Sequence, residues 1–256
     1  MKFRFNKKEA LKIIQFENDL NSGQGDQQDL TEAAILSVKQ MRKNMLNNAG
    51  DKIKAIIQKY LPNENISIQE IRSLEEKINK KVKKYEITRN ENQLEEIFHL
   101  IHLWGGNTGR NIYVMGGGFK KNIRISSYKK LIDAAIDFSQ IDELVNQISI
   151  FKSNSSNICT PFITKHTRFF SQQNKLLPFL PIYDSLLSAG LMQKWSNKYK
   201  KYKRLNIPSS PAKKIGQNEL SFYWMNMIEL SNELKMSLNK LERILFNHFR
   251  NAKNQS

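Results

Sequence analysis

The sequence has almost no cysteine, with Cys159 as its only one. A lone thiol excludes an intramolecular disulfide and any metal site that needs several thiolates. The sequence also lacks a run of about 18 apolar residues, the length that a membrane-spanning helix requires. Its first residues, MKFRFNKKEALKII, are basic but carry no long apolar segment of the kind found in secretory signals. We therefore expect a cytoplasmic protein with no membrane partner.

Alternating apolar and polar residues, the pattern of a half-buried β-strand, are scarce as well. Apolar residues recur instead at helical spacing, as in SIQEIRSLEEKINKKVKKY, where Ser67 and Glu70 have the spacing of a capping box. We expect a mainly α-helical fold. The expected helices lie at 30–46, 51–61, 67–85, 92–104, 126–151, 185–203 and 219–250.

Acidic residues are the minority charge, since 24 Asp and Glu stand against 41 Lys and Arg and give a formal net charge of +17. A polyanion would exploit this charge, because neutralised phosphates release their counterions and the field steers association. The abundance of lysine, asparagine and isoleucine is also typical of AT-rich coding, and the charge would then only coat a soluble surface. Nucleic acid is the partner that the charge favours.

Two histidines, His99 and His102, lie three residues apart in the helix expected at 92–104. Both have apolar neighbours, and no acidic or cysteine ligand accompanies them at the spacing of a zinc site. We expect a packed histidine pair, and we expect no metal or cofactor.

The glycine-rich stretches GGNTGRN and MGGGF fit no nucleotide-binding fingerprint. The first lacks the Lys-Ser/Thr of a P-loop, and no strand precedes it. Their glycines allow turns with positive φ or a close approach of the backbone to another group. Plain turns are one interpretation, and an approach to a DNA phosphate or to a base near Trp104 is the other.

The stretch TPFITKHTRFF places Lys165 among aromatic residues. We expect Thr164 to cap a helix whose first turn holds Lys165, His166 and Arg168. The positive end of a helix and desolvation by the neighbouring phenylalanines both lower the pKa of a lysine, and only the neutral amine is a nucleophile. A solvated lysine is the alternative.

Asp184 follows the proline-braced run PFLPIYD and precedes SLLSAGLMQKW. Its simplest role is an N-cap, because aspartate is a preferred residue at that position. Because the prolines before it restrict the backbone, such a cap would also be a carboxylate in a fixed position. It would accept a proton from a nucleophile or stabilise positive charge on a sugar as a glycosidic bond breaks.

A Thr-Lys at the head of a helix, an aspartate nineteen residues later and a basic, nearly all-helical chain resemble the helix-hairpin-helix DNA glycosylases. The resemblance is to the 8-oxoguanine DNA glycosylase branch and its bacterial relatives. It implies that Lys165 attacks the sugar C1′ and displaces the damaged base. The resulting Schiff base would undergo β-elimination, and Asp184 would assist deprotonation and stabilise the oxocarbenium-like charge.

The resemblance covers residues 94–250, and its specific part is confined to 158–190. The family's hairpin has a Pro-Gly-x-Gly run that grips a phosphate, whereas CTPFI keeps a proline and no glycine. Phosphate contacts are therefore expected from Thr164, His166, Thr167 and Arg168. We expect an N-terminal helical region at 1–90 and a glycosylase-like core at 91–256, with the helix-hairpin-helix near 140–175.

A glycosylase must extrude its target nucleotide from the base stack, and a damaged or modified base flips more readily. The aromatic candidates for stacking or wedging are Trp104, Phe119, Phe162 and Trp224. Each of them also fits a core position.

The sequence therefore predicts a monomeric, nucleoid-associated DNA glycosylase with abasic-site lyase activity, acting on double-stranded DNA with a damaged or modified base. Oxidised purine is the substrate that the resemblance implies, and a modified base in invading DNA is a variant. One alternative is a non-enzymatic nucleic-acid-binding protein in which Lys165 contacts a phosphate and Asp184 is a plain cap. A helical interaction protein is the other.

Overall fold

The computed structural model describes residue 12 and residues 32–115, 118–172, 174, 177–183 and 217–254. These residues form eleven α-helices and no strand, which confirms a mainly α-helical protein. A first compact unit spans Asp29–Pro178, and the last two helices belong to a second. None of the described helices is both long and apolar enough to cross a membrane.

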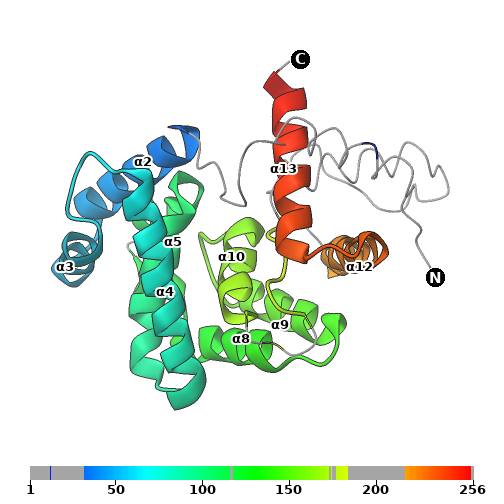
Figure 1. Ribbon diagram of the computed structural model, residues 1–256. Coiled ribbons are helices and arrows are strands. Elements are labelled where there is room, and N and C mark those ends of the chain that lie inside the picture. The colour runs from blue at the N-terminus through cyan, green and yellow to red at the C-terminus, as the bar shows by residue number, and fades with distance from the viewer. Residues whose placement is uncertain are drawn as a thin grey trace. The chain divides into compact units, whose positions relative to one another are not determined.

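The first unit contains nine α-helices and two short 3-10 helices (Figure 1). They are α2 (Glu32–Asn48), α3 (Asp51–Tyr60), α4 (Ile68–Thr88), η1 (Glu91–Gln93), α5 (Leu94–Gly105), η2 (Asn107–Gly109), α6 (Asn111–Val114), α7 (Phe119–Asn122), α8 (Ile125–Asp137), α9 (Ile141–Ser153) and α10 (Thr160–Phe170).

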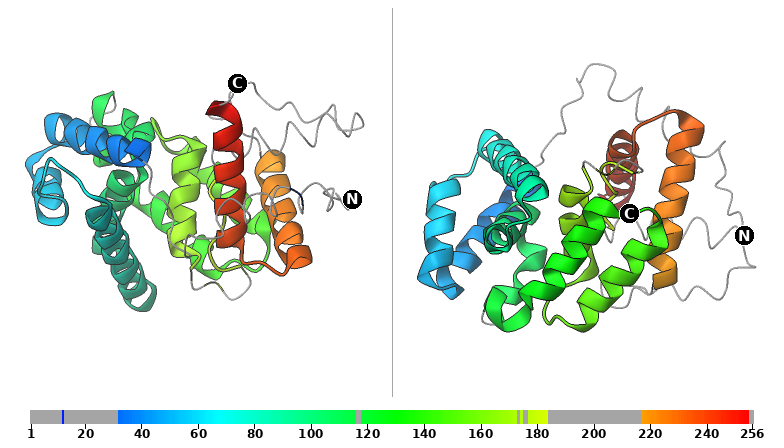
Figure 2. Two further views of the ribbon diagram at one scale, coloured as in Figure 1. Left: turned by 45° about the horizontal axis from the view of Figure 1, so that its top comes forward. Right: turned by 90° about the horizontal axis from the view of Figure 1, so that it is seen from below.

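Helix α5 is the centre of this unit and packs against α2, α3, α4, α8 and α10. Its sequence, LEEIFHLIHLWG, is apolar on nearly all sides, and every residue from Ile97 to Leu103 is buried. A helix that is hydrophobic all round is stable only inside a protein, which explains why the other helices surround it. Figure 2 shows α8 and α9 side by side, where they pack against each other.

The capping box expected at the start of α4 is present. The Ser67 hydroxyl accepts a hydrogen bond from the Glu70 amide, and the Glu70 carboxylate accepts one from the Ser67 amide. The apolar stripe of this helix is buried, as its spacing predicted. Helix α4 then ends at Arg89, whose φ of 47° is left-handed.

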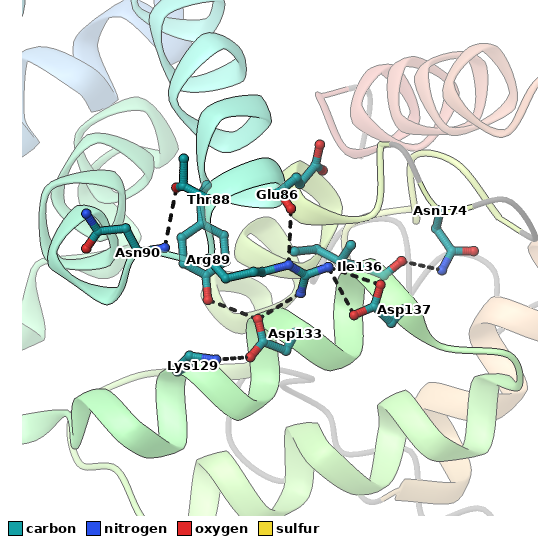
Figure 3. A network of polar contacts seen from close by, with 10 residues as sticks. Glu86, Thr88, Arg89, Asn90, Lys129, Asp133, Ile136, Asp137 and Asn174 are labelled. Atoms are coloured by element: carbon teal, nitrogen blue, oxygen red, sulfur yellow. Dashed lines mark hydrogen bonds and ion pairs between the residues drawn. The ribbon is translucent and has the colours of Figure 1, made fainter.

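Arg89 also joins α4 to α8 (Figure 3). Its guanidinium donates to Asp133 at 2.9 Å and to Asp137 at 3.1 Å, while Tyr85 donates to Asp133 at 2.9 Å. Lys129 also pairs with Asp133. Burial opposes ionisation of Asp133, but these donors prevail and hold its pKa below the usual value.

Two expected helices are broken in the structure. The stretch at 126–151 divides into α8 and α9, because Phe138 turns into an extended, buried conformation and Gln140 with Glu143 caps a new helix. The stretch at 219–250 divides into α12 (Gln217–Leu234) and α13 (Leu238–Asn254), with a left-handed Lys235 between them. The helix expected at 185–203 lies outside the described residues.

Candidate lysine site and its buried histidines

Lys165 lies in the middle of α10, which corrects the expectation that it occupies a first turn. The helix begins at Thr160, with Cys159 as its N-cap and Pro161 close behind. Proline fits there because the first amides of a helix need no intrahelical acceptor. Thr164 is therefore not a cap, and the positive end of the helix lies more than a turn away from Lys165.

The Lys165 ammonium contacts the end of α5 and an aromatic ring of its own helix. Its Nζ donates a hydrogen bond of 2.7 Å to the carbonyl of Gly105, the last residue of α5. It also lies 4.5 Å from the centre of the Phe162 ring, a cation–π geometry. Because the C-terminal carbonyls of a helix have no intrahelical partner, Lys165 also caps α5. Its side chain is part-buried in a defined position.

The glycines of GGNTG make room for Phe162. A Cβ on Gly105 would lie 2.8 Å from the Phe162 ring, and a Cβ on Gly109 would lie 2.5 Å from it. Gly106 has a φ of 79°, a conformation that suits glycine. The backbone of this stretch therefore comes close to the Phe162 ring of the protein itself, whereas an approach to a DNA phosphate or a base stays a prediction.

We expect Gly109→Ala to destabilise the protein by about 1–3 kcal/mol, because the added methyl overpacks Phe162 and His102. Chemical denaturation with circular dichroism would measure this loss. Gly50→Ala is the control, since a Cβ there meets nothing within 4 Å. Equal losses at the two positions would contradict the packing role of Gly109.

Three of the four side chains expected to contact phosphate are buried. Thr164, His166 and Thr167 have no exposed surface, and both threonine hydroxyls donate to carbonyls of their own helix. This burial overturns their assignment as DNA contacts, because α10 packs against α4, α5 and α8. Arg168 is partly exposed, so a contact with a DNA phosphate stays a prediction for this residue.

The histidines of α5 meet His166 in a buried polar network. The Nδ1 of His166 lies 2.7 Å from the Tyr128 hydroxyl, and its Nε2 lies 3.2 Å from the Nδ1 of His102. The Nδ1 of His102 also lies 3.2 Å from the Phe98 carbonyl. These contacts are satisfied together when His102 carries its proton on Nδ1 and donates it, and His166 carries its proton on Nδ1 and donates it to Tyr128.

His99 forms a second buried pair with Tyr113, at 2.7 Å between Nδ1 and the hydroxyl. The Nε2 atoms of His99 and His102 are buried without a hydrogen-bond partner. Both histidines are therefore packed, as their apolar neighbours predicted. Among the residues that the structure describes, no group of three or more histidine, cysteine or acidic side chains is placed to hold a metal ion.

Burial keeps the three histidines neutral. It lowers the pKa of His99 to about 4 and that of His166 to about 3, with the nearby Lys165 ammonium contributing to the second shift. Burial and the neighbouring His166 lower the pKa of His102 as well. The Lys165 ammonium is therefore close to two buried histidines, His102 and His166, that resist protonation.

The aromatic candidates have unequal exposure. Phe119, Phe162 and Trp224 are buried in the core, and the Trp224 indole donates to the Pro181 carbonyl at 2.8 Å. Trp104 is partly exposed and donates to Glu75 at 3.3 Å. Of the four, only Trp104 has surface to offer to a base.

Lys152 is another of the part-buried lysines that the structure describes, and the sequence pattern did not single it out. Lys152, in the last turn of α9, donates to the Thr160 hydroxyl at 3.0 Å, and burial lowers its pKa. Nothing in its local sequence, IFKSNSS, distinguishes it from a solvated lysine. Lys152 is therefore an alternative candidate for the nucleophile.

Asn122 forms hydrogen bonds with the connection between α9 and α10. The Ser156 hydroxyl and the side-chain amide of Asn157 both donate to the side-chain oxygen of Asn122 at 2.8 Å. The backbone amide of Ser156 donates to the backbone carbonyl of Asn122 at 3.1 Å. Asn157 has a φ of 58° and so supplies the left-handed turn for which a glycine is the usual choice.

Asp184 lies outside the described residues, so the structure does not place it relative to Lys165. Comparison with protein families, curated proteins and solved structures found no match to the chain.

Proposed function

We propose that the protein is a lysine-dependent DNA glycosylase with abasic-site lyase activity, which excises an oxidised or otherwise modified base. The observation that carries the proposal is the position of Lys165. A single amine is fixed between the end of α5 and the Phe162 ring, partly shielded from water. The connection at 154–159, between two helices, and the net charge of +17 support a DNA substrate.

In the proposed reaction, the lone pair of the Lys165 Nζ forms a bond to the sugar C1′. The bond between C1′ and the base nitrogen breaks, and the base leaves with that electron pair and gains a proton. The bonded Nζ then carries two protons and loses one of them; the C1′–O4′ bond breaks, O4′ gains a proton, and a protonated Schiff base is left. Removal of a C2′ proton then expels the 3′ phosphate by β-elimination. We propose Asp184 as the carboxylate that assists deprotonation and stabilises the oxocarbenium-like charge.

The hydrogen bond to Gly105 sets a condition on this chemistry. A carbonyl acceptor favours the ammonium form, whereas nucleophilic attack needs the neutral amine. The bound sugar must therefore displace Nζ from the Gly105 carbonyl. The cation–π contact with Phe162 also favours the ammonium, so Nζ must leave this ring as well.

Borohydride trapping on duplexes with an abasic site, 8-oxoguanine or modified pyrimidines tests the proposal. We expect a covalent adduct whose peptide map places the DNA remnant on Lys165. The duplex that is trapped identifies the class of base, and free-base release measured in parallel reports excision directly. Unreacted wild-type protein without borohydride is the control.

Two outcomes overturn the proposal. An adduct on Lys152 instead would assign the nucleophile to that lysine. Absence of both adduct and released base, with salt-dependent DNA binding intact, would identify a non-enzymatic nucleic-acid-binding protein.

A further inference from the structure

Acidic residues are missing from a long part of the first unit. No aspartate or glutamate occurs between Glu96 and Asp133. Within this part, four cations are exposed around α6 and α7, namely Arg110, Lys120, Lys121 and Arg124. This part of the chain therefore carries positive charge and contains no acidic residue that would neutralise it.

The ion pairs of the described residues lie elsewhere. They join α3 to the start of α5, α4 to the start of α5, and α4 to α8, with two further pairs inside α3 and α8. None of them includes the four exposed cations. Charges that are neutralised within the fold add little to a partner's binding, whereas unneutralised ones are available to it.

The segment from Arg110 to Arg124 folds on itself and has a distinct inner and outer side. The backbone amide of Gly118 donates to the Ile112 carbonyl at 2.8 Å, and the side-chain amide of Asn122 donates to the Gly118 carbonyl at 2.6 Å. The buried side consists of Ile112, Tyr113, Phe119, Asn122 and Ile123. The four cations are exposed and so lie outside this buried side; we call the exposed residues of α6, α7 and their ends the α6–α7 surface.

Two apolar side chains also lie on the α6–α7 surface. Met115 is 75% exposed and Val114 is 48% exposed, directly after α6 and before a run of glycines. Proteins that bend or open a duplex place apolar side chains against base steps, with cations on the flanking phosphates. An anionic membrane also attracts cations with apolar residues, but α6 and α7 span four residues each and are too short to lie in an interface as an amphipathic helix.

We infer that the α6–α7 surface is the docking site for duplex DNA. Arg110, Lys120, Lys121 and Arg124 contact backbone phosphates, and Met115 inserts against the bases. The inference rests on the proposed function, since it names where the substrate of Lys165 docks. The Asn122 side chain connects this surface to the turn at 156–157.

Salt-dependent binding to an undamaged duplex tests the phosphate contacts. The double variant Lys120→Gln/Lys121→Gln is expected to weaken binding about tenfold or more and to reduce the slope of log K against log salt by about 2. The matched control is Lys83→Gln/Lys84→Gln, two adjacent exposed lysines on α4. Equal losses in the two variants would overturn the inference, as would tighter binding to single-stranded RNA or to anionic vesicles than to the duplex.

Met115→Ala tests the contact with bases. Wild-type protein is expected to raise the fluorescence of 2-aminopurine within a duplex, because unstacking relieves its quenching, and the variant is expected to lose most of that rise with an unchanged salt slope. An unchanged fluorescence rise would overturn the role of Met115. Thermal melts of both variants verify folding.

These readouts are separate from the chemistry. A Lys165 adduct with an unaffected salt slope in Lys120→Gln/Lys121→Gln would refute the docking site and leave the enzyme standing. A reduced salt slope with no adduct and no released base would refute the enzyme and leave the docking site standing.

Discussion

Replacing Lys165 with glutamine is expected to abolish the covalent adduct with an abasic duplex. Glutamine has no amine to form a Schiff base, so the loss should be complete rather than partial. Binding to the undamaged duplex should stay near the wild-type level, because Lys165 is part-buried and its Nζ already contacts the Gly105 carbonyl. Borohydride trapping and a binding titration on the same preparation measure the two effects.

Lys165→Arg separates the chemical role from the structural one. Arginine keeps the positive charge and can donate to the Gly105 carbonyl, but its guanidinium stays protonated and does not attack C1′. We expect Lys165→Arg to have near wild-type stability and no adduct. Lys152→Gln serves as the matched variant at a part-buried lysine whose pKa burial lowers, and it should retain the adduct. An adduct that survives in Lys165→Arg and disappears in Lys152→Gln would reverse the assignment.

Acidification is expected to unfold the protein at a pH at which most carboxylates are still ionised. The pKa of an unfolded histidine is about 6.5. Folding lowers the pKa of His99 to about 4 and of His166 to about 3, and lowers that of His102 in the same direction. Below pH 6.5 the unfolded chain therefore binds more protons than the folded one, and stability falls with falling pH.

Each buried histidine removes up to about 1.4 kcal/mol of stability per pH unit in this window. Three together remove about 4 kcal/mol per unit, a large part of the roughly 5–15 kcal/mol that stabilises a typical domain. The loss begins near pH 6.5 and, for His99, ends near its folded pKa of about 4. Stability is independent of these groups only well above pH 6.5, where the unfolded histidines are neutral too.

Urea denaturation between pH 8 and pH 5 measures this dependence. His102→Leu removes one titrating ring of similar volume and should reduce the slope by about a third, although it leaves the His166 Nε2 without its partner. A free energy of unfolding that stays constant between pH 6.5 and pH 5 would show that the rings take up protons without loss of the fold.

The elements of the first unit follow from local rules, whereas the site depends on long-range contacts. Ser67, Glu70 and the apolar spacing of α4 are visible in the sequence and correctly predict a buried helix. Pro161 also marks the true start of α10, because proline favours the first helical turn. Choosing Thr164 as the cap placed Lys165 one turn too early.

The histidine network shows what local rules leave out. The spacing of His99 and His102 predicts a packed pair, but His166 joins them from 64 positions beyond His102. The same applies to Gly109, whose need for glycine comes from the Phe162 ring and not from its own turn. Periodicity also predicted one helix where Phe138 separates α8 from α9, since both halves keep an apolar face.

The Asn122 side chain has a consequence for how the first unit opens. Its amide donates to a carbonyl of the α6–α7 segment while its oxygen accepts two hydrogen bonds from the turn at 156–157. Because it is buried, releasing either segment leaves unsatisfied polar atoms that the other segment cannot satisfy. Opening of either segment therefore breaks hydrogen bonds of Asn122, and we expect the two segments to open together in local unfolding.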